Sequence, residues 1–444
     1  MMKTSHIKIY TFVEKMKYIQ ATVLMALAFN VQAMTIEHAI ESAVRLDPSL
    51  RSSKLNQLAT GENIAIARAR LLPQITLQGS SNELTQTTTQ DLPNGSSASR
   101  SFTGPSVNHQ FIIRQALIRP KELSSLRYAE VQNHYMELKY KYDVSELKLK
   151  VINVWIELLS AQEIVQTYAR TLPYLEAAAR QELVKFEQGE GTKDIAIEAH
   201  AQYENAKANH LQAEETLKAK QVTFEKLTSV QFIEIAEKKI VFEPWDFLDE
   251  VKKELIWNAR RENSLEIKMA DLQESMQLER VKIAEADHKP TLDLLAALNL
   301  AQNDATSTQG YQYKNKQIGI QYSIPLYAGG GHSASLKQAE YMLNAIKLDK
   351  EAILMKLEIE FENNWSQLIG GRKRMAALIQ SKNAIDIQLK AVKKGYELGT
   401  KTISEVASIV MLQGRREIDL NTSWQELSKI LIKLKFKNNQ IFKE

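Results

Sequence analysis

Strict alternation of apolar and polar positions marks four segments of the chain, two in each half. They lie at about residues 73–80, 107–117, 291–300 and 316–326. In the last segment, Ile318, Ile320 and Tyr322 alternate with Gly319 and Gln321. A period of two over roughly 10 residues predicts a β-strand with one apolar and one polar face. Such a strand fits either an ordinary half-buried hairpin or a membrane strand, and periodicity alone leaves both open.

The stretches between the paired segments favour the membrane alternative. Asn82–Gly104 and Gln302–Gln312 are rich in Ser, Thr, Asn and Gln, as expected of solvated loops at the mouth of a barrel. Four strands cannot close a membrane barrel, for which about eight is the minimum, and open strand edges are not tolerated in lipid. If the segments lie in a membrane, several copies of the chain must therefore share one barrel.

Long helices are predicted after each pair of strands. They lie at about residues 120–188, 194–228, 332–398 and 402–436. In the first, apolar residues recur at spacings of four and three, which is the seam of a coiled coil. These residues are Leu147, Val151, Val154, Leu158, Ala161, Val165, Tyr168, Leu172 and Leu175. The equivalent seam of the second half is diluted by Asn364, Gly371 and Lys382. Because short turns join the helices of each pair, we expect antiparallel hairpins.

The two halves of the chain repeat one pattern. The spacing between Trp155 and Trp365 equals that between Gly189 and Gly399. Weaker matches follow in the same order, with small changes in offset that loop insertions would produce. We therefore predict an internal twofold sequence repeat. Its parts are a first repeat at residues 34–230, a linker at 231–255, a second repeat at 256–437 and a tail at 438–444.

Composition agrees with long elements and few turns. The 444 residues include 16 Gly and 9 Pro, whereas average usage predicts about 31 and 22. The absence of Cys excludes disulfides, thiolate metal sites and Cys nucleophiles. The formal net charge of +4 excludes a strongly basic nucleic-acid binder.

Residues 1–33 have the order of a secretory signal peptide. Met16-Lys17 precedes an apolar run from Ala21 to Phe29, and Val31-Gln32-Ala33 fits a cleavage site. Met16 is an alternative start of this signal, and a buried or amphipathic helix is the alternative to a signal. Removal of residues 1–33 takes away four Lys and one Glu and leaves a net charge of +1. No later segment offers the roughly 18 consecutive apolar residues of a transmembrane helix.

Several local strings resemble the TolC family of outer-membrane efflux and secretion channels. The strings are Ala67-Arg-Ala-Arg-Leu-Leu-Pro73, Pro290-Thr-Leu-Asp-Leu294, Ser323-Ile-Pro-Leu-Tyr-Ala-Gly-Gly330 and Gly395-Tyr-Glu-Leu-Gly-Thr-Lys-Thr-Ile-Ser-Glu-Val406. The resemblance extends from about Thr35 to Phe436, and the last two strings are its most specific part.

This resemblance implies a mainly α fold with a membrane β-barrel part. A homotrimer would share a twelve-stranded barrel in outer-membrane lipid, and its antiparallel coiled coils would form a long α-barrel in the periplasm. It implies a channel that conducts substrates passively, without enzymatic activity, cofactor or metal. The partners would be a periplasmic adaptor (membrane fusion) protein and an inner-membrane efflux pump or an ABC-type secretion transporter of type I. Drugs, metals and secreted proteins all stay open as substrates.

The resemblance also implies a periplasmic gate at the turns after the two longest helices. Matched residue by residue, the gating positions of the family correspond to Asp194, Tyr396, Lys401 and Glu405. Lys401 replaces an arginine, which keeps the charge but loses the bidentate fork. Ser408 replaces the second aperture acid, so cation binding at the aperture stays open. The helix-tip turns that hold these positions contain Gly189, Thr192, Gly399 and Thr402.

A local role explains the same residues equally well. Thr192 and Thr402 occupy N-cap positions, and Asp194 and Glu405 then fall in the first helical turn, where the helix dipole favours a carboxylate. Helix capping and gating are compatible.

Two other classes of protein fit the sequence less well. A coiled-coil scaffold would explain the helices but neither the signal nor the alternating segments, and fractionation of the outer membrane would distinguish it. A hydrolase or metalloenzyme has little support. The pairs His200/Glu204 and His210/Glu214 lack a second His ligand, and Gly329-Gly-Gly331 lacks the Lys-Ser/Thr of a phosphate loop.

Overall fold

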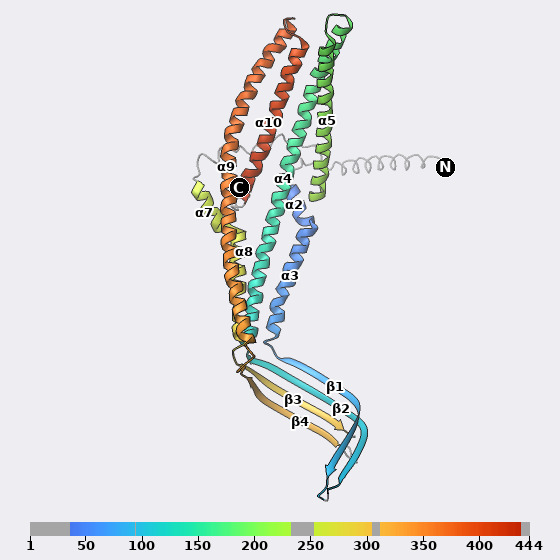
Figure 1. Cartoon of the computed structure of the whole chain (residues 1–444), viewed down its shortest axis with the longest axis vertical. Coiled ribbons are helices and arrows are strands. Elements are labelled where there is room, and N and C mark those ends of the chain that lie inside the picture. The colour runs from blue at the N-terminus through green and yellow to red at the C-terminus, as the bar shows by residue number, and fades with distance from the viewer. Residues whose placement is uncertain (1–35, 94, 232–252, 304–310, 437–444) are drawn as a thin grey trace, which may run out of the picture. The chain divides into compact units, whose positions relative to one another are not determined.

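A computed structural model describes residues 36–93, 95–231, 253–303 and 311–436 of the chain (Figure 1). The predicted signal peptide at 1–33, the predicted tail at 438–444 and most of the predicted linker at 231–255 lie outside these residues. Among the described helices, none has the length and apolar character needed to cross a bilayer.

The described elements follow one order twice: helix, helix, strand, strand, helix, helix. The first series is α2 (Ile36–Leu46), α3 (Pro48–Ala69), β1 (Gln74–Asp91), β2 (Ser97–Ile118), α4 (Pro120–Glu187) and α5 (Lys193–Thr228). The second is α7 (Lys253–Asn263), α8 (Leu265–Ala286), β3 (Thr291–Asn303), β4 (Tyr311–Ser323), α9 (Gly331–Glu397) and α10 (Ile403–Phe436). The predicted mainly helical chain with four strands is confirmed, and the strands are antiparallel. The assignment of the chain to repeats at 34–230 and 256–437 stays a prediction.

Four of these helices were not expected from the sequence. The helices α2 and α3 precede the first strand pair, and α7 and α8 precede the second. The apolar residues of α3 and α8 do not gather on one face, so they lack the period that identifies an amphipathic helix.

The strands form one antiparallel sheet in the order β1-β2-β3-β4. Each strand pairs with its neighbour in sequence, and β1 and β4 are its two edges. The register places Ile75 opposite Ile113, Ile113 opposite Ala296 and Ala296 opposite Ile318. Since side chains alternate between the two faces of a strand, the apolar positions of all four strands share one face.

The prediction of a loop at Asn82–Gly104 was wrong. β1 continues to Asp91 and β2 begins at Ser97, so most of this polar stretch is a paired hairpin. Hydroxyl groups meet across its strands, as between Thr85 and Thr103 at 2.9 Å and between Thr87 and Ser101 at 3.0 Å. Thr is β-branched and favours strands, and such hydroxyl pairs stabilise a ladder without apolar residues.

The predicted bounds of the last strand also need correction. β4 begins at Tyr311, five residues before the predicted start, and ends at Ser323. Pro325 has no N–H group to donate to a ladder, so Ile324 and Leu326 continue the alternation of the sequence without continuing the strand.

The coiled-coil seam forms the core of the helical region. In α4, Val151, Leu158 and Leu175 are almost completely buried. In α9, α10 packs closely against the seam position Gly371, because a Cβ there would lie 2.5 Å from Cδ2 of Leu427. The glycine that diluted the seam in the sequence therefore permits close packing of two helices.

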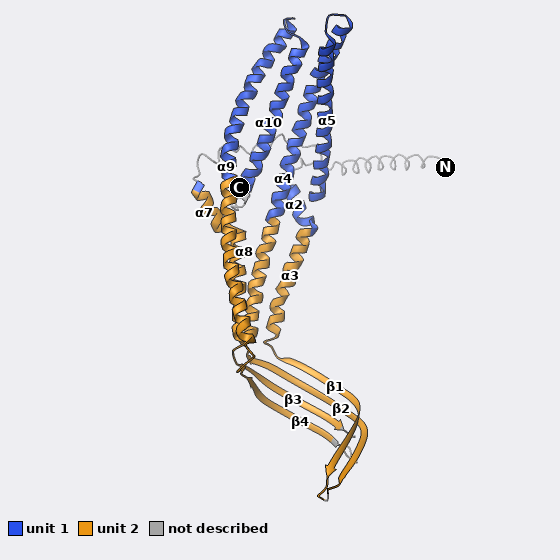
Figure 2. Cartoon of the chain, viewed as in Figure 1, with its two compact units in different colours: residues 1–48, 145–253, 364–444 blue, residues 49–144, 254–363 orange. Residues whose placement is uncertain are grey.

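The chain divides into two compact units, which both draw on each half of the sequence (Figure 2). Unit 1 includes residues 145–253 and 364–444 and contains the tips of the long helices. Unit 2 comprises residues 49–144 and 254–363 and contains the sheet.

Candidate functional site

The two helix-tip turns of unit 1 have the same backbone geometry. Gly189, after α4, has a φ angle of 77°, and Gly399, after α9, has a φ angle of 72°. In the first turn, the amide of Glu190 donates to the carbonyl of Lys185 at 2.8 Å and that of Gly189 to Phe186 at 3.0 Å. The equivalent bonds of the second turn run from Thr400 to Gly395 and from Gly399 to Tyr396. This is the Schellman motif, whose left-handed residue is favourable as glycine.

Each turn also has a glycine where the other turn has a lysine. Lys185 and Gly191 in the first turn correspond to Gly395 and Lys401 in the second. A Cβ on Gly191 would lie 3.2 Å from Cβ of Lys185, and a Cβ on Gly395 would lie 2.6 Å from Cγ of Lys401. Two side chains therefore do not fit at this pair of positions without a shift. As a result, the first tip carries its lysine on α4 and the second carries it on the turn.

The second turn ends in a complete capping box. The hydroxyl of Thr402 accepts from the amide of Glu405 at 3.2 Å, and the carboxylate of Glu405 accepts from the amide of Thr402 at 2.8 Å. Lys401 donates to the same carboxylate at 2.6 Å. The Lys401 hydrogen bond, followed by that of the Thr402 amide, holds the pKa of Glu405 below its usual value. The structure thus brings Lys401, Thr402 and Glu405 together as a local network.

The first turn lacks this capping box. Thr192 has the extended backbone of an N-cap, but its side chain makes no capping hydrogen bond. The predicted N-cap position of Thr192 is confirmed, but the position equivalent to Glu405 is Ile195, which cannot accept the amide of Thr192, so no capping box forms.

The remaining gating positions lie apart from that network. Asp194 is exposed in the first turn of α5, and Tyr396 is 44% exposed in the last turn of α9. Ser408 lies one turn beyond Glu405 and donates to the carbonyl of Ser404 at 2.9 Å. Within the described part of one chain, no hydrogen bond joins Asp194 or the Tyr396 side chain to Lys401 or Glu405.

Sequence reasoning missed the residue that ties the two tips together. Glu182 of α4 is buried, and its carboxylate accepts from Ser404 of α10 at 2.7 Å and from Lys185 at 2.9 Å. Burial favours the protonated acid, but the hydrogen bonds from Lys185 and Ser404 and the charge of Lys185 outweigh it. The pKa of Glu182 is therefore lowered.

The signal for Glu182 was present in the sequence. The spacing of four and three that ends at Leu175 continues through Ala179 to Glu182. A carboxylate at a seam position is buried against the partner helix, where it needs hydrogen-bond donors. A charged residue at a seam position therefore indicates a specific hydrogen-bonded contact rather than a site where the two helices pack poorly.

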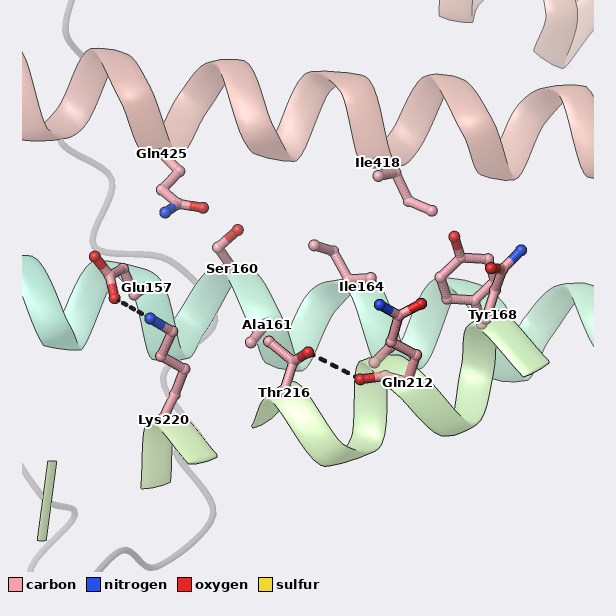
Figure 3. A pocket seen from close by; sticks show the side chains of 12 residues that line it. Glu157, Ser160, Ala161, Ile164, Tyr168, Gln212, Thr216, Lys220, Ile418 and Gln425 are labelled. Carbon is pink, nitrogen blue, oxygen red and sulfur yellow. Dashed lines mark hydrogen bonds and ion pairs between the residues drawn. The ribbon is translucent and has the colours of Figure 1, made fainter. Parts of the chain in front are cut away.

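A cleft of about 400 Å³ lies farther along the same helices, between α4, α5 and α10 (Figure 3). Glu157 of α4 accepts from Lys220 of α5 and from Lys429 of α10, both at 2.6 Å. Burial raises the pKa of Glu157, but the hydrogen bonds and charges of both lysines outweigh this effect and lower it. The other labelled lining residues are mostly amides, hydroxyls and aliphatic groups: Ser160, Ala161, Ile164, Tyr168, Gln212, Thr216, Ile418 and Gln425. This lining suits contact with a helical surface more than chemistry on a substrate.

Comparison with known proteins identifies the family. The chain matches the family model described as Outer membrane efflux protein at residues 39–229 and 257–413, well over half of its length. It is 26% identical to Outer membrane protein TolC of Vibrio cholerae over 390 residues, covering 86% of this chain and 85% of the relative. It is 25% identical to Proteases secretion protein PrtF of Dickeya chrysanthemi over 415 residues, covering 90% and 88%.

A solved structure shows the same fold. The Campylobacter jejuni CmeC outer membrane channel superposes with a TM-score of 0.74 at 13% identity, covering 91% of this chain and 85% of that one. The matches confirm the prediction of an outer-membrane efflux or secretion channel that is not an enzyme. The chain belongs to the outer membrane efflux protein family, the family of TolC-like channels.

Proposed function

We propose that three copies of this chain form the exit duct of an efflux pump or of a type I secretion system. The strands of the three copies would close one twelve-stranded barrel in the outer membrane, and the long helical hairpins would lie in the periplasm. Substrates would pass through passively, driven by an inner-membrane transporter that sets their identity.

The open sheet carries this proposal. Its edge strands β1 and β4 have no outer partner among the described residues. The face that the apolar positions share is exposed in one copy, with Leu77 at 74%, Ile318 at 77% and Tyr322 at 72%. Lipid would cover such a face, but unpaired backbone groups at the edges cost several kcal/mol each in lipid. Neighbouring copies would remove both edges.

Apolar side chains at the helix tips also support assembly. Several are exposed in one copy, although the chain has a long buried seam elsewhere. They are Leu183, Val184, Phe186, Ile195, Ile197 and Leu398. Exposed apolar side chains at the ends of hairpins are typical of a contact with another copy or a partner.

The gate of the proposed duct would be the two helix-tip turns. Tyr396 is half exposed and available to a neighbouring copy, whereas Lys401 is held by Glu405 of its own turn. Both would restrain the tip in the closed state. Glu405, repeated by three copies, would place three carboxylates at the aperture.

We expect Tyr396→Phe combined with Lys401→Ala to raise single-channel conductance several-fold. The double variant removes the phenolic hydroxyl and the charge that would hold the tips, and it also frees Glu405. The measurement is the current through single trimers in a planar bilayer. Tyr341→Phe with Lys347→Ala is the matched control, because both residues are exposed and lie on α9 away from its tip. Equal conductance of wild type and gate variant would remove these residues from the gate.

We further propose that the periplasmic adaptor docks over the cleft between α4, α5 and α10. We expect Gln212→Cys, with a cysteine-reactive photo-crosslinker attached, to capture the adaptor in intact cells. The chain has no native Cys, so the label reports one position. Glu214→Cys points to a different side of α5 and is the control. Equal capture from both positions, or none from Gln212→Cys, would count against docking at this cleft.

A further inference from the structure

One face of the sheet is apolar over its first rows. We call this the apolar face, and it begins at the end of the sheet where the strands join α3, α4, α8 and α9. Its residues are Ile75, Leu77, Phe111, Ile113, Leu294, Ala296, Leu298, Ile318, Ile320 and Tyr322. Tyr322 opens the face at its helical end, where an aromatic residue is typical of the membrane interface.

Two lysines interrupt the apolar face on β4. Lys316 lies opposite Leu298, and Lys314 lies opposite Leu300 in the next row. Both side chains are exposed, and neither has an ion-pair partner in the part of the chain that the structure describes. A cation among lipid-facing residues is costly near the middle of a bilayer and tolerated only near its interfaces.

The spacing of the rows places Lys314 near the outer interface and Lys316 in the outer half of the apolar band. Lys316 is six residues and Lys314 eight residues from Tyr322 along β4. At about 3.4 Å per residue and a tilt of about 40°, these separations correspond to heights of about 16 Å and 21 Å. The apolar band of a barrel is about 25 Å tall. Lys314 is then about 4 Å and Lys316 about 9 Å from the outer boundary. A lysine side chain that extends about 6 Å along the strand brings the Lys314 ammonium group to this boundary and the Lys316 ammonium group to a few Å below it.

Beyond the lysines, the same side of the sheet carries the facing pairs Ser81–Val107 and Glu83–Pro105 and then becomes a ladder of hydroxyl groups. The hairpin of β1 and β2 continues past the last row of β3 and β4 (Figure 1) and carries the facing pairs Thr85–Thr103, Thr87–Ser101 and Thr89–Ser99. The part of β1 from Ser81 to Asp91 is about 34 Å long. The headgroup layer of a phospholipid leaflet is only about 6 Å thick.

We propose that Lys314 and Lys316, together with this hydroxyl ladder, bind a phosphorylated glycolipid of the outer leaflet. The ammonium groups meet the anionic phosphates of its headgroup at the boundary of the apolar face. The hydroxyl groups lie along its sugars, which extend much farther than a phospholipid headgroup. The inference rests on the proposed function, because it requires the apolar face to lie in the outer membrane.

The test measures glycolipid retention by the full-length trimer purified in detergent. Bisphosphorylated lipid A bearing its core sugars is titrated, and bound lipid is counted by native mass spectrometry. We expect Lys314→Gln with Lys316→Gln to weaken retention about 30-fold, since each cation contributes about a fivefold gain near an anionic surface. Lys314→Arg with Lys316→Arg should retain wild-type binding. Arg100→Gln, on the opposite face of the same hairpin, is the control and should also retain it.

Three outcomes would overturn the inference. Undiminished retention by the double Gln variant would exclude the lysines. Equally tight retention of phosphatidylglycerol would show a phospholipid site, and competition by millimolar inorganic phosphate would show a simple anion site. Conductance of the same variant in a neutral bilayer is measured separately. If channels form but retention does not depend on the lysines, only this inference fails, whereas absence of channels from every variant would contradict the proposed function.

Discussion

Asp293→Asn should lower the stability of unit 2 strongly. Asp293 of β3 is almost completely buried and accepts two hydrogen bonds from Arg119, one of them from Nε at 2.9 Å. Arg119 joins β2 to α4, next to a shift of register between Ala116 and Ile118. The ion pair therefore fixes the point at which a strand ends and a helix begins.

The expected cost is about 3 kcal/mol, the lower end for breaking a buried pair, because the Arg119 side chain is 27% exposed. The measurement is the temperature at which the trimer dissociates, which should fall by several degrees. Asp271→Asn breaks a half-exposed pair with Lys350 and should cost no more than about 1 kcal/mol. Joint replacement by Arg119→Met and Asp293→Leu should recover much of the loss, because the cost comes from leaving one charge unpaired. Equal effects of Asp293→Asn and Asp271→Asn would show that the pair is not structural.

Glu182→Gln should open the gate at neutral pH. The amide keeps the shape of the carboxylate and can accept from Ser404, but it loses the ion pair with Lys185. Hydrogen bonds to a charged group contribute about 1.5–3 kcal/mol. If the contact between Glu182 of α4 and Ser404 of α10 exists only in the closed state, the fraction of open channels should rise about tenfold or more. Glu187→Gln, an exposed change at the end of α4, is the matched control.

The pH dependence of conductance distinguishes the contribution of Glu182 from that of other carboxylates. The pKa of Glu182 lies below its ordinary value of 4.5, so the ionised form of Glu182 stabilises the contact with Ser404 and Lys185. Its stabilisation is fully present above pH 4.5 and is lost only as pH falls through the lowered pKa. Wild-type conductance should therefore stay constant from pH 7 to pH 5 and rise in stronger acid.

The pKa of Glu405 is also lowered, so part of this acid response belongs to the capping box. The difference between wild type and Glu182→Gln isolates the contribution of Glu182. A variant that opens no more than Glu187→Gln at pH 7, or that keeps the whole acid response, would contradict the role of Glu182.

The sequence predicted the elements whose physical cause is local. The seam through Val151 and Leu158 follows from spacing alone, and Gly189 and Gly399 end their helices because the backbone needs positive φ there. The capping box at Thr402 and Glu405 is equally local, since both residues lie within one turn.

What the sequence did not reveal depends on pairing between distant residues. The hairpin through Thr85 and Thr103 has the composition of a loop and becomes a strand only through its partner. Gly371 looks like a defect until Leu427 of α10 is placed against it. Glu182 looks unfavourable at a seam until Ser404, more than 200 residues away, supplies a donor.

The two open edges of the sheet also affect how the protein matures. Helical hairpins can form early, since their contacts are local and need no second copy. In the proposed trimer, the backbone groups on the outer sides of β1 and β4 would find partners only when copies meet. The rate of closing the sheet would therefore rise more steeply than linearly with the concentration of the protein. Newly exported chains that wait for neighbours present two strand edges as templates for incorrect pairing. Assembly of the proposed trimer would therefore need either rapid encounter between copies or a holding factor that covers those edges until they meet.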